Sequence, residues 1–279
     1  MTSLSAGIRI PVRRMDYQFP ADMPRYWYRG NPWLTHFMNG LSAVFPDGER
    51  FFIQSVRNYQ DRIDDPVLQK QIRNFIGQEA NHGKEHEAFN TLLEERFGVP
   101  MSRIAAYTKR RLGKAQERVP KVRQLAMTAA LEHFTAIMAH QLLENPDVME
   151  GLEAAYGDMF MWHAVEETEH KAVAYDVYQQ VSGDYAIRVQ TMAVATVMFL
   201  AHQFAFMTWM VARDGKLGDI KGFIDLVKFL YVEPGPLRKM FGDYIDYYRR
   251  DFHPWMHDNR ALITKRVEEL KNKELRSAA

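Results

Sequence analysis

Residues 79–82 read Glu-Ala-Asn-His and residues 167–170 read Glu-Thr-Glu-His, each within a long stretch of helical periodicity. Side chains three positions apart lie on the same face of an α-helix. Each glutamate and its histidine can therefore reach the same metal ion. The two pairs predict that two helices of this chain face a common metal centre.

Two further glutamates, Glu49 and Glu132, lie on the two remaining candidate long helices. Four helices that offer Glu, Glu-x-x-His, Glu and Glu-x-x-His form the ligand set of ferritin-like dimetal carboxylate proteins. We therefore expect an all-α fold, a ferritin-like four-helix bundle with an N-terminal arm and additional C-terminal helices.

Each helical face that carries a glutamate–histidine pair also carries one further histidine. At about 100° per residue, His86 falls on the face of the first pair and His163 on the face of the second. These two histidines are either metal ligands or groups that orient the ligands from one layer further out. The full set of expected ligands shares imidazole or carboxylate chemistry and comprises Glu49, Glu79, His82, His86, Glu132, His163, Glu167 and His170.

Some of these assignments have close competitors. Glu166 lies three residues after His163 and is the alternative to Glu167 as a ligand, or else a general base. Glu132 is preferred to Glu144 because it falls in the middle of its helix. Glu49 follows a predicted helix start at Asp47, where a glutamate is also explained by the helix dipole.

A lone Glu-x-x-His also occurs by chance on solvated helices. Here the flanking residues are apolar, with Phe75 and Phe89 around the first pair and Trp162 and Val173 around the second. Charged groups on a core-facing stripe are costly unless they are paired or metal-bound. The context therefore favours a metal site over a solvated face.

Turn and capping signals divide the chain into helices. Asp65 before Pro66 marks a start, and Gly98 marks an end. The expected helices are 31–41 (short), 47–61, 66–97, a short one within 99–118, 121–144, 147–156 (short) and 158–181. In domain terms, we expect residues 1–45 to form an arm packed on a single helical metal-binding domain, 46–279, with its core bundle at 46–181 and covering helices at 186–279.

Residues 192–211 read MAVATVMFLAHQFAFMTWMV, a run about long enough to span a bilayer. A helix that is apolar on all sides is buried either in a protein or in a membrane. The ordinary composition of the rest of the chain favours a buried fifth helix that covers the bundle. Membrane or lipid contact through 192–211 is the alternative, and the Met and Phe side chains of this helix could line a tunnel for an apolar molecule.

The amino-acid composition limits which metal ligands and partners the chain is expected to have. The chain has 279 residues, no cysteine and a formal net charge of +1. Without thiolates, any metal must use imidazole and carboxylate, which suit iron, manganese and zinc. The near-neutral charge gives no reason to expect nucleic acid as a partner. The first residues lack an apolar core of signal-peptide length, so we expect a cytoplasmic protein, with peripheral membrane attachment as the alternative.

Four segments of the chain resemble a known family. They are residues 45–52 (FPDGERFF), 75–82 (FIGQEANH), 131–135 (LEHFT) and 162–171 (WHAVEETEHK). They resemble the bacterial family called predicted metal-dependent hydrolases, and the resemblance spans about residues 10–250. It implies a metal enzyme and leaves the reaction open. The ligand order is also similar to that of the wider ferritin-like superfamily, which includes di-iron oxidases and metal-storage proteins.

Three functions compete on these grounds. We favour O2-dependent oxidation of a small apolar or fatty substrate by two divalent transition-metal ions, with iron preferred to manganese or zinc. The alternative is a hydrolase that uses a metal-activated water, with Glu166 as general base. A non-catalytic metal-binding or storage protein is the third. A homodimer is a possible assembly in each case.

Overall fold

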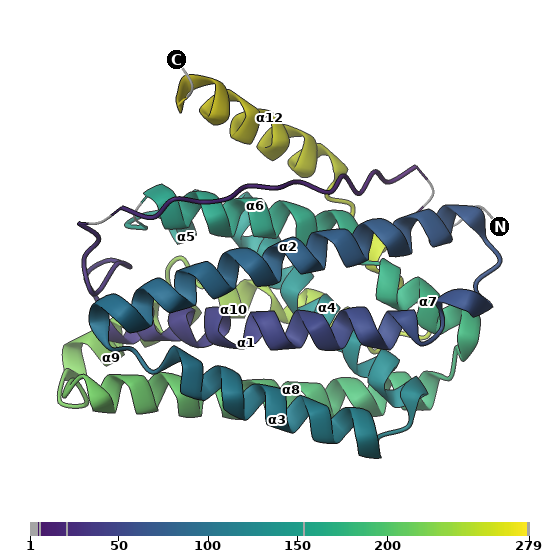
Figure 1. The fold of residues 1–279 in the computed structure, drawn as a ribbon, viewed down its shortest axis with the longest axis horizontal. Helices are drawn as coiled ribbons and strands as arrows, with labels where there is room; N and C mark the ends of the chain where they lie inside the picture. Colours follow the sequence, from purple (N-terminus) through teal and green to yellow (C-terminus); the bar gives the residue numbers. More distant parts are fainter. Residues whose placement is uncertain (1–4, 6, 21, 153, 278–279) are drawn as a thin grey trace.

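Four long helices carry the expected ligands and pack against one another in the computed structural model (Figure 1). They are α1 (Pro32–Arg57), α2 (Pro66–Phe97), α4 (Lys121–Glu144) and α6 (Ala154–His170). The structure describes residues 5, 7–20, 22–152 and 154–277. Within those residues it is helical, with no strand beyond an isolated bridge between Tyr28 and Leu152. The all-α prediction is therefore confirmed.

Shorter and later helices surround this bundle. They are α3 (Met101–Arg118), α5 (Pro146–Met149), α7 (Val173–Val181), α8 (Tyr185–Arg213), α9 (Ile220–Tyr231), α10 (Pro236–Lys239), α11 (Phe241–Asp246) and α12 (Arg260–Ser277), with 3-10 turns at Gln60–Arg62 and Pro254–Met256. Both α3 and α8 pack on α1, along the lower edge of Figure 1, while α12 lies at the opposite edge.

The ends of α2 follow the signals in the sequence. Asp65 caps the helix by accepting a hydrogen bond from the Val67 amide, and Pro66 occupies the first helical position. At the other end Gly98 adopts φ 67°, the left-handed conformation that glycine accepts without strain. The bounds of α2 and α4 are those predicted.

The predicted helix start at Asp47, two residues before Glu49, is wrong. Helix α1 runs from Pro32, capped by Asn31, through Pro46 to Arg57, so the expected boundary between residues 45 and 46 falls inside a helix. A proline inside a helix leaves the carbonyl four residues earlier without its amide donor. Here that carbonyl belongs to Ser42, and it accepts a hydrogen bond of 2.9 Å from Asn90 Nδ2 of α2 instead. The neighbouring helix thus compensates for the proline.

Two other helix predictions need correction. The expected helix 158–181 is divided, since α6 ends at His170 and α7 begins at Val173. The Lys171 ammonium at this break donates to the His257 carbonyl at 2.6 Å, which ties the break to the C-terminal segment. Helix α3 is 18 residues long, longer than the short helix expected in 99–118.

Helix α8 covers the bundle as expected, but most of it is not buried. It packs against α1 and α4. By length and composition it could cross a membrane, yet only 28% of its most apolar window is buried. One side, with Met192, Ala195 and Met207, belongs to the core, and the other side faces outward. The prediction of a buried helix is therefore correct for one face only.

The N-terminal arm, described at residues 7–20 and 22–31, crosses the outside of α2 and α6 before it enters α1 (Figure 1). The backbone amides of Asp16 and Tyr17 each donate to the Glu85 carboxylate at 3.0 Å. Glu85 is buried, and these two hydrogen bonds engage both of its carboxylate oxygens. Residues 1–4 and 278–279 of the predicted domain ranges lie outside the described residues.

Candidate metal centre

Seven of the eight expected ligands converge in the middle of the bundle. They come from all four long helices and are at most 5% exposed: Glu49, Glu79, His82, Glu132, His163, Glu167 and His170. Because Pro46 lies within α1, Glu49 sits two-thirds along that helix and not in a first turn. The helix-dipole explanation for Glu49 therefore does not apply.

The donor atoms form two neighbouring groups. Glu49, His82 and His163 offer atoms within 4.8 Å of one another, and so do Glu79, Glu167 and His170. Glu132 joins the second group, with its Oε2 atom 3.4 Å from His170 Nε2.

Glu167 lies between the two groups. Its Oε1 atom is 2.9 Å from His163 Nε2, 3.5 Å from His82 Nδ1 and 3.6 Å from His170 Nε2. A carboxylate in this position can contact ions in both groups. The arrangement therefore offers two adjacent groups of donor atoms with Glu167 between them.

The residues present fit such ions because their polar atoms are otherwise unsatisfied. Among the described residues, the carboxylate oxygens of Glu49, Glu79 and Glu132 find no hydrogen-bond partner outside the cluster, nor do His82 Nδ1, His170 Nε2 and Glu167 Oε2. Their nearest polar neighbours are one another, as where Glu79 Oε1 lies 3.0 Å from His170 Nε2. Buried polar atoms without partners are rare and costly. A cation site requires several such atoms directed at the same small region, and each of the two groups meets this requirement. Four carboxylates also match the charge of two divalent ions.

The electrostatics of the cluster point the same way. Burial, and then the charge of Glu79, raises the pKa of Glu49 well above its usual range. Burial likewise raises the pKa of Glu132. Burial opposes the protonation of His82, but hydrogen bonds to Glu166 and Glu167 outweigh it and raise the pKa of His82 to about 10. Without a cation the cluster thus holds protons, and metal ions would displace them.

Glu166 holds a ligand in place. Its Oε2 atom lies 3.1 Å from His82 Nε2, and its Oε1 atom accepts a hydrogen bond of 2.9 Å from Arg13. Carboxylates that bond the far nitrogen of a metal-binding imidazole fix its orientation and tautomer. With both oxygens engaged, Glu166 is placed to orient His82, so the geometry does not favour the expected role of free general base.

A matching contact orients His170 on the other side of the centre. Its Nδ1 atom lies 2.9 Å from Gln78 Oε1, and Gln78 Nε2 donates to Glu169 at 2.8 Å. Arg13 binds both oxygens of Glu169, at 2.8 and 2.7 Å. Glu169 is thus in an ion pair, and it is buried.

Arg13 joins the networks that orient the two histidines, a role that no sequence pattern predicts. It lies in an irregular arm, about 150 residues from its carboxylate partners. Gln78 precedes the ligand Glu79 directly, but an amide beside a ligand carries no signal of its own.

His86 is not brought to the cluster. Its Nε2 atom lies 2.7 Å from His163 Nδ1, and its Nδ1 atom lies 2.8 Å from Ser42 Oγ. Both ring nitrogens are therefore engaged away from the donor groups. His163, in contrast, directs Nε2 towards Glu167 and is the third histidine of the centre. The geometry favours the orienting alternative for His86 and the ligand alternative for His163.

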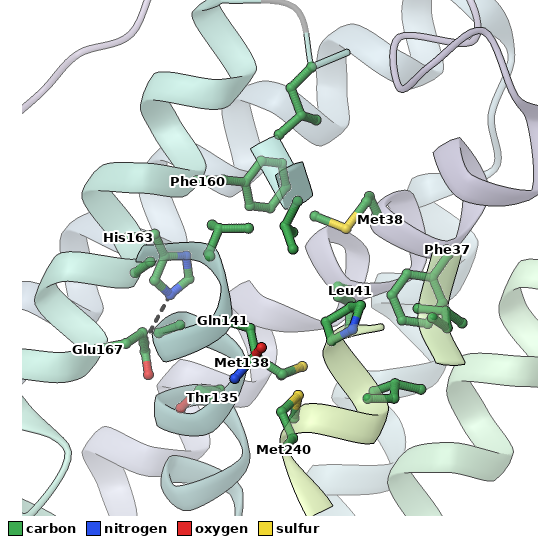
Figure 2. Close-up of a pocket in the computed structure, with 18 of the residues that line it drawn as sticks. Phe37, Met38, Leu41, Thr135, Met138, Gln141, Phe160, His163, Glu167 and Met240 are labelled. Atoms are coloured by element: carbon green, nitrogen blue, oxygen red, sulfur yellow. Dashed lines mark hydrogen bonds and ion pairs between the residues drawn. The ribbon is translucent and has the colours of Figure 1, made fainter. Parts of the chain in front are cut away.

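An apolar cavity adjoins the centre. It encloses about 840 Å³ of empty space, counting the part open to solvent, and His163 and Glu167 form part of its wall. Figure 2 shows these two residues, joined by their contact, on one side of the cavity, with Phe37, Leu41, Met138 and Met240 around the rest. Thr135 and Gln141 supply the few polar groups. The cavity suits an apolar molecule that reaches the metal centre.

Comparison with known families agrees with this site. A family model described as "predicted metal-dependent hydrolase" matches residues 11–258. The chain belongs to this family. The matched region contains all seven converging donors, Arg13 and both partners of Arg13, so the whole centre is part of the shared family region. No curated protein and no solved structure matches the chain significantly.

Proposed function

We propose that this protein is a hydrolase that uses two divalent metal ions to cleave an ester or amide bond in an apolar substrate. The observation that carries the proposal is the convergence of buried, unpartnered carboxylate and imidazole atoms beside an apolar cavity. The family description supports hydrolysis, the alternative that the sequence left second. It gives no support to oxidation, which the sequence favoured.

In this proposal the seven converging donors would hold the ions, with Glu167 placed between the two groups. Divalent ions in such a site lower the pKa of water towards about 7 and polarise a carbonyl oxygen. The cavity wall beside these donors is almost wholly apolar, so the chain offers few groups that hold ordered water there. Thr135 and Gln141 are the groups able to orient a polar bond within that wall, and Glu166 keeps His82 in one orientation.

The test compares metal-free protein with protein loaded with zinc, manganese or ferrous iron. Substrates are p-nitrophenyl esters of increasing acyl length. We expect activity only with metal and a higher kcat/KM for longer chains, since each buried methylene contributes about 0.8 kcal/mol. Glu132→Gln should abolish activity, while Glu144→Gln, an exposed position on the same helix, should not. Metal-independent activity, or none with any metal, would contradict the proposal.

Oxidation remains a second candidate because four carboxylates from four helices are typical of di-iron carboxylate proteins. It is tested by adding oxygen to reduced, iron-loaded protein in the presence of fatty acids. Oxygen uptake coupled to an oxidised product supports this candidate. Equal turnover of esters without oxygen supports hydrolysis.

Metal storage is the third candidate. It is less consistent with a centre that adjoins a cavity lined by Phe37, Met38, Phe160 and Met240, since ions need no apolar wall. Protein that binds two ions but converts none of these substrates, in either assay, would favour it.

A further inference from the structure

The outer side of α8 is an exposed apolar stripe. Residues 189–212 contain no charged residue other than the ionisable His202. Val194, Val197, Leu200 and Phe204 are each more than half exposed on this side. At about 100° per residue they occupy one continuous strip of the helix surface. Exposed apolar strips of this kind mark contacts with partners or membranes.

The neighbouring helix α3 is strongly basic. It carries six lysines and arginines and one acidic residue, Glu117, in a protein whose total net charge is +1. The six are exposed, and none pairs with an acidic group among the described residues: Arg103, Lys109, Arg110, Arg111, Lys114 and Arg118. All but Lys109 fall within about 100° of one another around the helix.

The basic row and the apolar stripe adjoin each other. Tyr107 belongs to the same side of α3 as the basic row, and its hydroxyl lies 3.1 Å from His202 Nε2 of α8. Figure 1 shows α3 and α8 running beside one another along the same edge of the molecule. The two helices thus form one face, apolar along α8 and positive along α3.

A second apolar cavity lies beneath this face. It encloses about 1230 Å³ of empty space, including the part open to solvent, between α1, α3, α4 and α8. Its inner wall contains the metal ligand Glu49, and its outer wall contains Arg111 and Met198, which are exposed. The cavity therefore connects the α3–α8 face with the metal centre.

We propose that the face formed by α3 and the outer side of α8 docks on the surface of an anionic lipid bilayer. An apolar helix flanked by lysine and arginine is the pattern of a peripheral membrane segment: the stripe enters the acyl boundary and the basic side chains bind acidic headgroups. A second copy of the chain fits less well, because a twofold interface on this face brings two positive α3 helices close together.

The proposed membrane docking goes beyond the proposed function and does not require that the protein is a hydrolase. One consequence for the reaction does rest on the proposed function: the docked protein places the outer end of the second cavity at the bilayer surface. An apolar substrate then passes from the lipid towards Glu49 without crossing water.

The test is co-sedimentation with vesicles of phosphatidylcholine alone or mixed with phosphatidylglycerol. We expect binding to the mixed vesicles that weakens as salt rises. Arg110→Gln with Lys114→Gln should weaken it about thirtyfold, at about 1 kcal/mol per basic residue. Val197→Asn with Phe204→Asn should weaken it about tenfold or more. Because these side chains are exposed, both double variants should keep the circular dichroism spectrum and Tm of the parent.

Matched controls lie on α2, away from the face. Lys70→Gln with Arg73→Gln removes two exposed charges, and Val67→Asn removes an exposed apolar side chain; both should leave vesicle binding unchanged. Equal binding to neutral and anionic vesicles, or unchanged binding by both α3 and α8 variants, overturns the proposal. So does a dimer in light scattering that the α8 variant dissociates while no vesicles are bound. The assay needs no turnover, so its outcome is independent of the proposed hydrolysis.

Discussion

Arg13 of the N-terminal arm donates to Glu166 of α6 at 2.9 Å, and Glu166 in turn contacts His82 Nε2 at 3.1 Å. A residue from the irregular arm thus joins the network that orients His82, a proposed metal ligand on α2. The same guanidinium binds Glu169, which reaches His170 through Gln78.

Arg13→Gln should lower metal affinity about 10- to 100-fold, the usual effect of removing a group that orients a ligand. Competition with a chromogenic chelator measures the change. Arg13→Lys keeps the charge but loses the two-pronged geometry and should restore only part of the affinity. Arg14→Gln, an exposed neighbour, is the control and should bind metal like the parent. Equal affinity in all three variants would show that Arg13 does not act on the centre.

His170→Ala should remove at least one of two metal ions per chain, because His170 Nε2 faces the carboxylates of Glu79, Glu132 and Glu167. Metal content by plasma emission, at matched protein concentration, gives the count. His202→Ala is the control, since His202 contacts Tyr107 on the far side of α1. A full metal content in His170→Ala is incompatible with the proposed centre.

His86→Ala and His163→Ala should differ. His163 faces the donor groups, so His163→Ala should lose an ion. His86 contacts His163 and Ser42, so His86→Ala should keep both ions and bind them about tenfold more weakly. Titration of metal-free protein separates number of sites from affinity. Loss of one ion in His86→Ala would make His86 a ligand, as the sequence allowed.

Asn90→Ala should destabilise the fold by about 1–3 kcal/mol, because it leaves the buried Ser42 carbonyl without a donor. Pro46→Ala restores a backbone amide at the position that could serve this carbonyl. The cost of Asn90→Ala should therefore be smaller in the Pro46→Ala background, as measured by urea unfolding of the four variants. Strictly additive costs would show that Asn90 does not compensate for the proline.

Asp214 should give a pH-dependent contribution to stability. Burial opposes its ionisation, but hydrogen bonds from His36 and Arg25 outweigh burial and hold the pKa of Asp214 well below its usual range. The ionised carboxylate of Asp214 is therefore the form that His36 and Arg25 stabilise in the folded protein. Its contribution is complete above the unfolded pKa of about 3.9 and declines as pH falls below that value towards the folded pKa.

The variant Asp214→Asn should accordingly be about 1–3 kcal/mol less stable at pH 7. That difference should stay constant from about pH 8 to pH 5 and shrink below about pH 4. Chemical unfolding at several pH values measures it, with Asp225→Asn, a half-exposed position on α9, as control. If the stability difference between Asp214→Asn and the parent grew as the pH fell, ionisation of Asp214 would not stabilise the fold.

The shared face of each glutamate–histidine pair was predictable because helical spacing is local. Glu79 with His82 and Glu167 with His170 need only the geometry of one helix each, and capping residues such as Asp65 and Gly98 fix where α2 begins and ends. These features required no knowledge of the neighbouring helices.

What the sequence could not supply depends on contacts between distant segments. Pro46 indicates a helix start unless Asn90 of another helix serves the Ser42 carbonyl. The roles of His86 and Glu166 depend on which way their rings and oxygens turn, and that is decided by Ser42 and Arg13. The one-sided burial of α8 likewise follows from its position on α1 and α4, not from its composition.

The position of Arg13 in the arm links two equilibria. If arm docking strengthens the hold on the ions by orienting His82, then bound ions must strengthen the docking of the arm by the same factor. Protease protection of residues 7–31 should therefore rise with metal occupancy. Metal content and protection of the arm are then two measures of one equilibrium, so a change in either should be matched by the other.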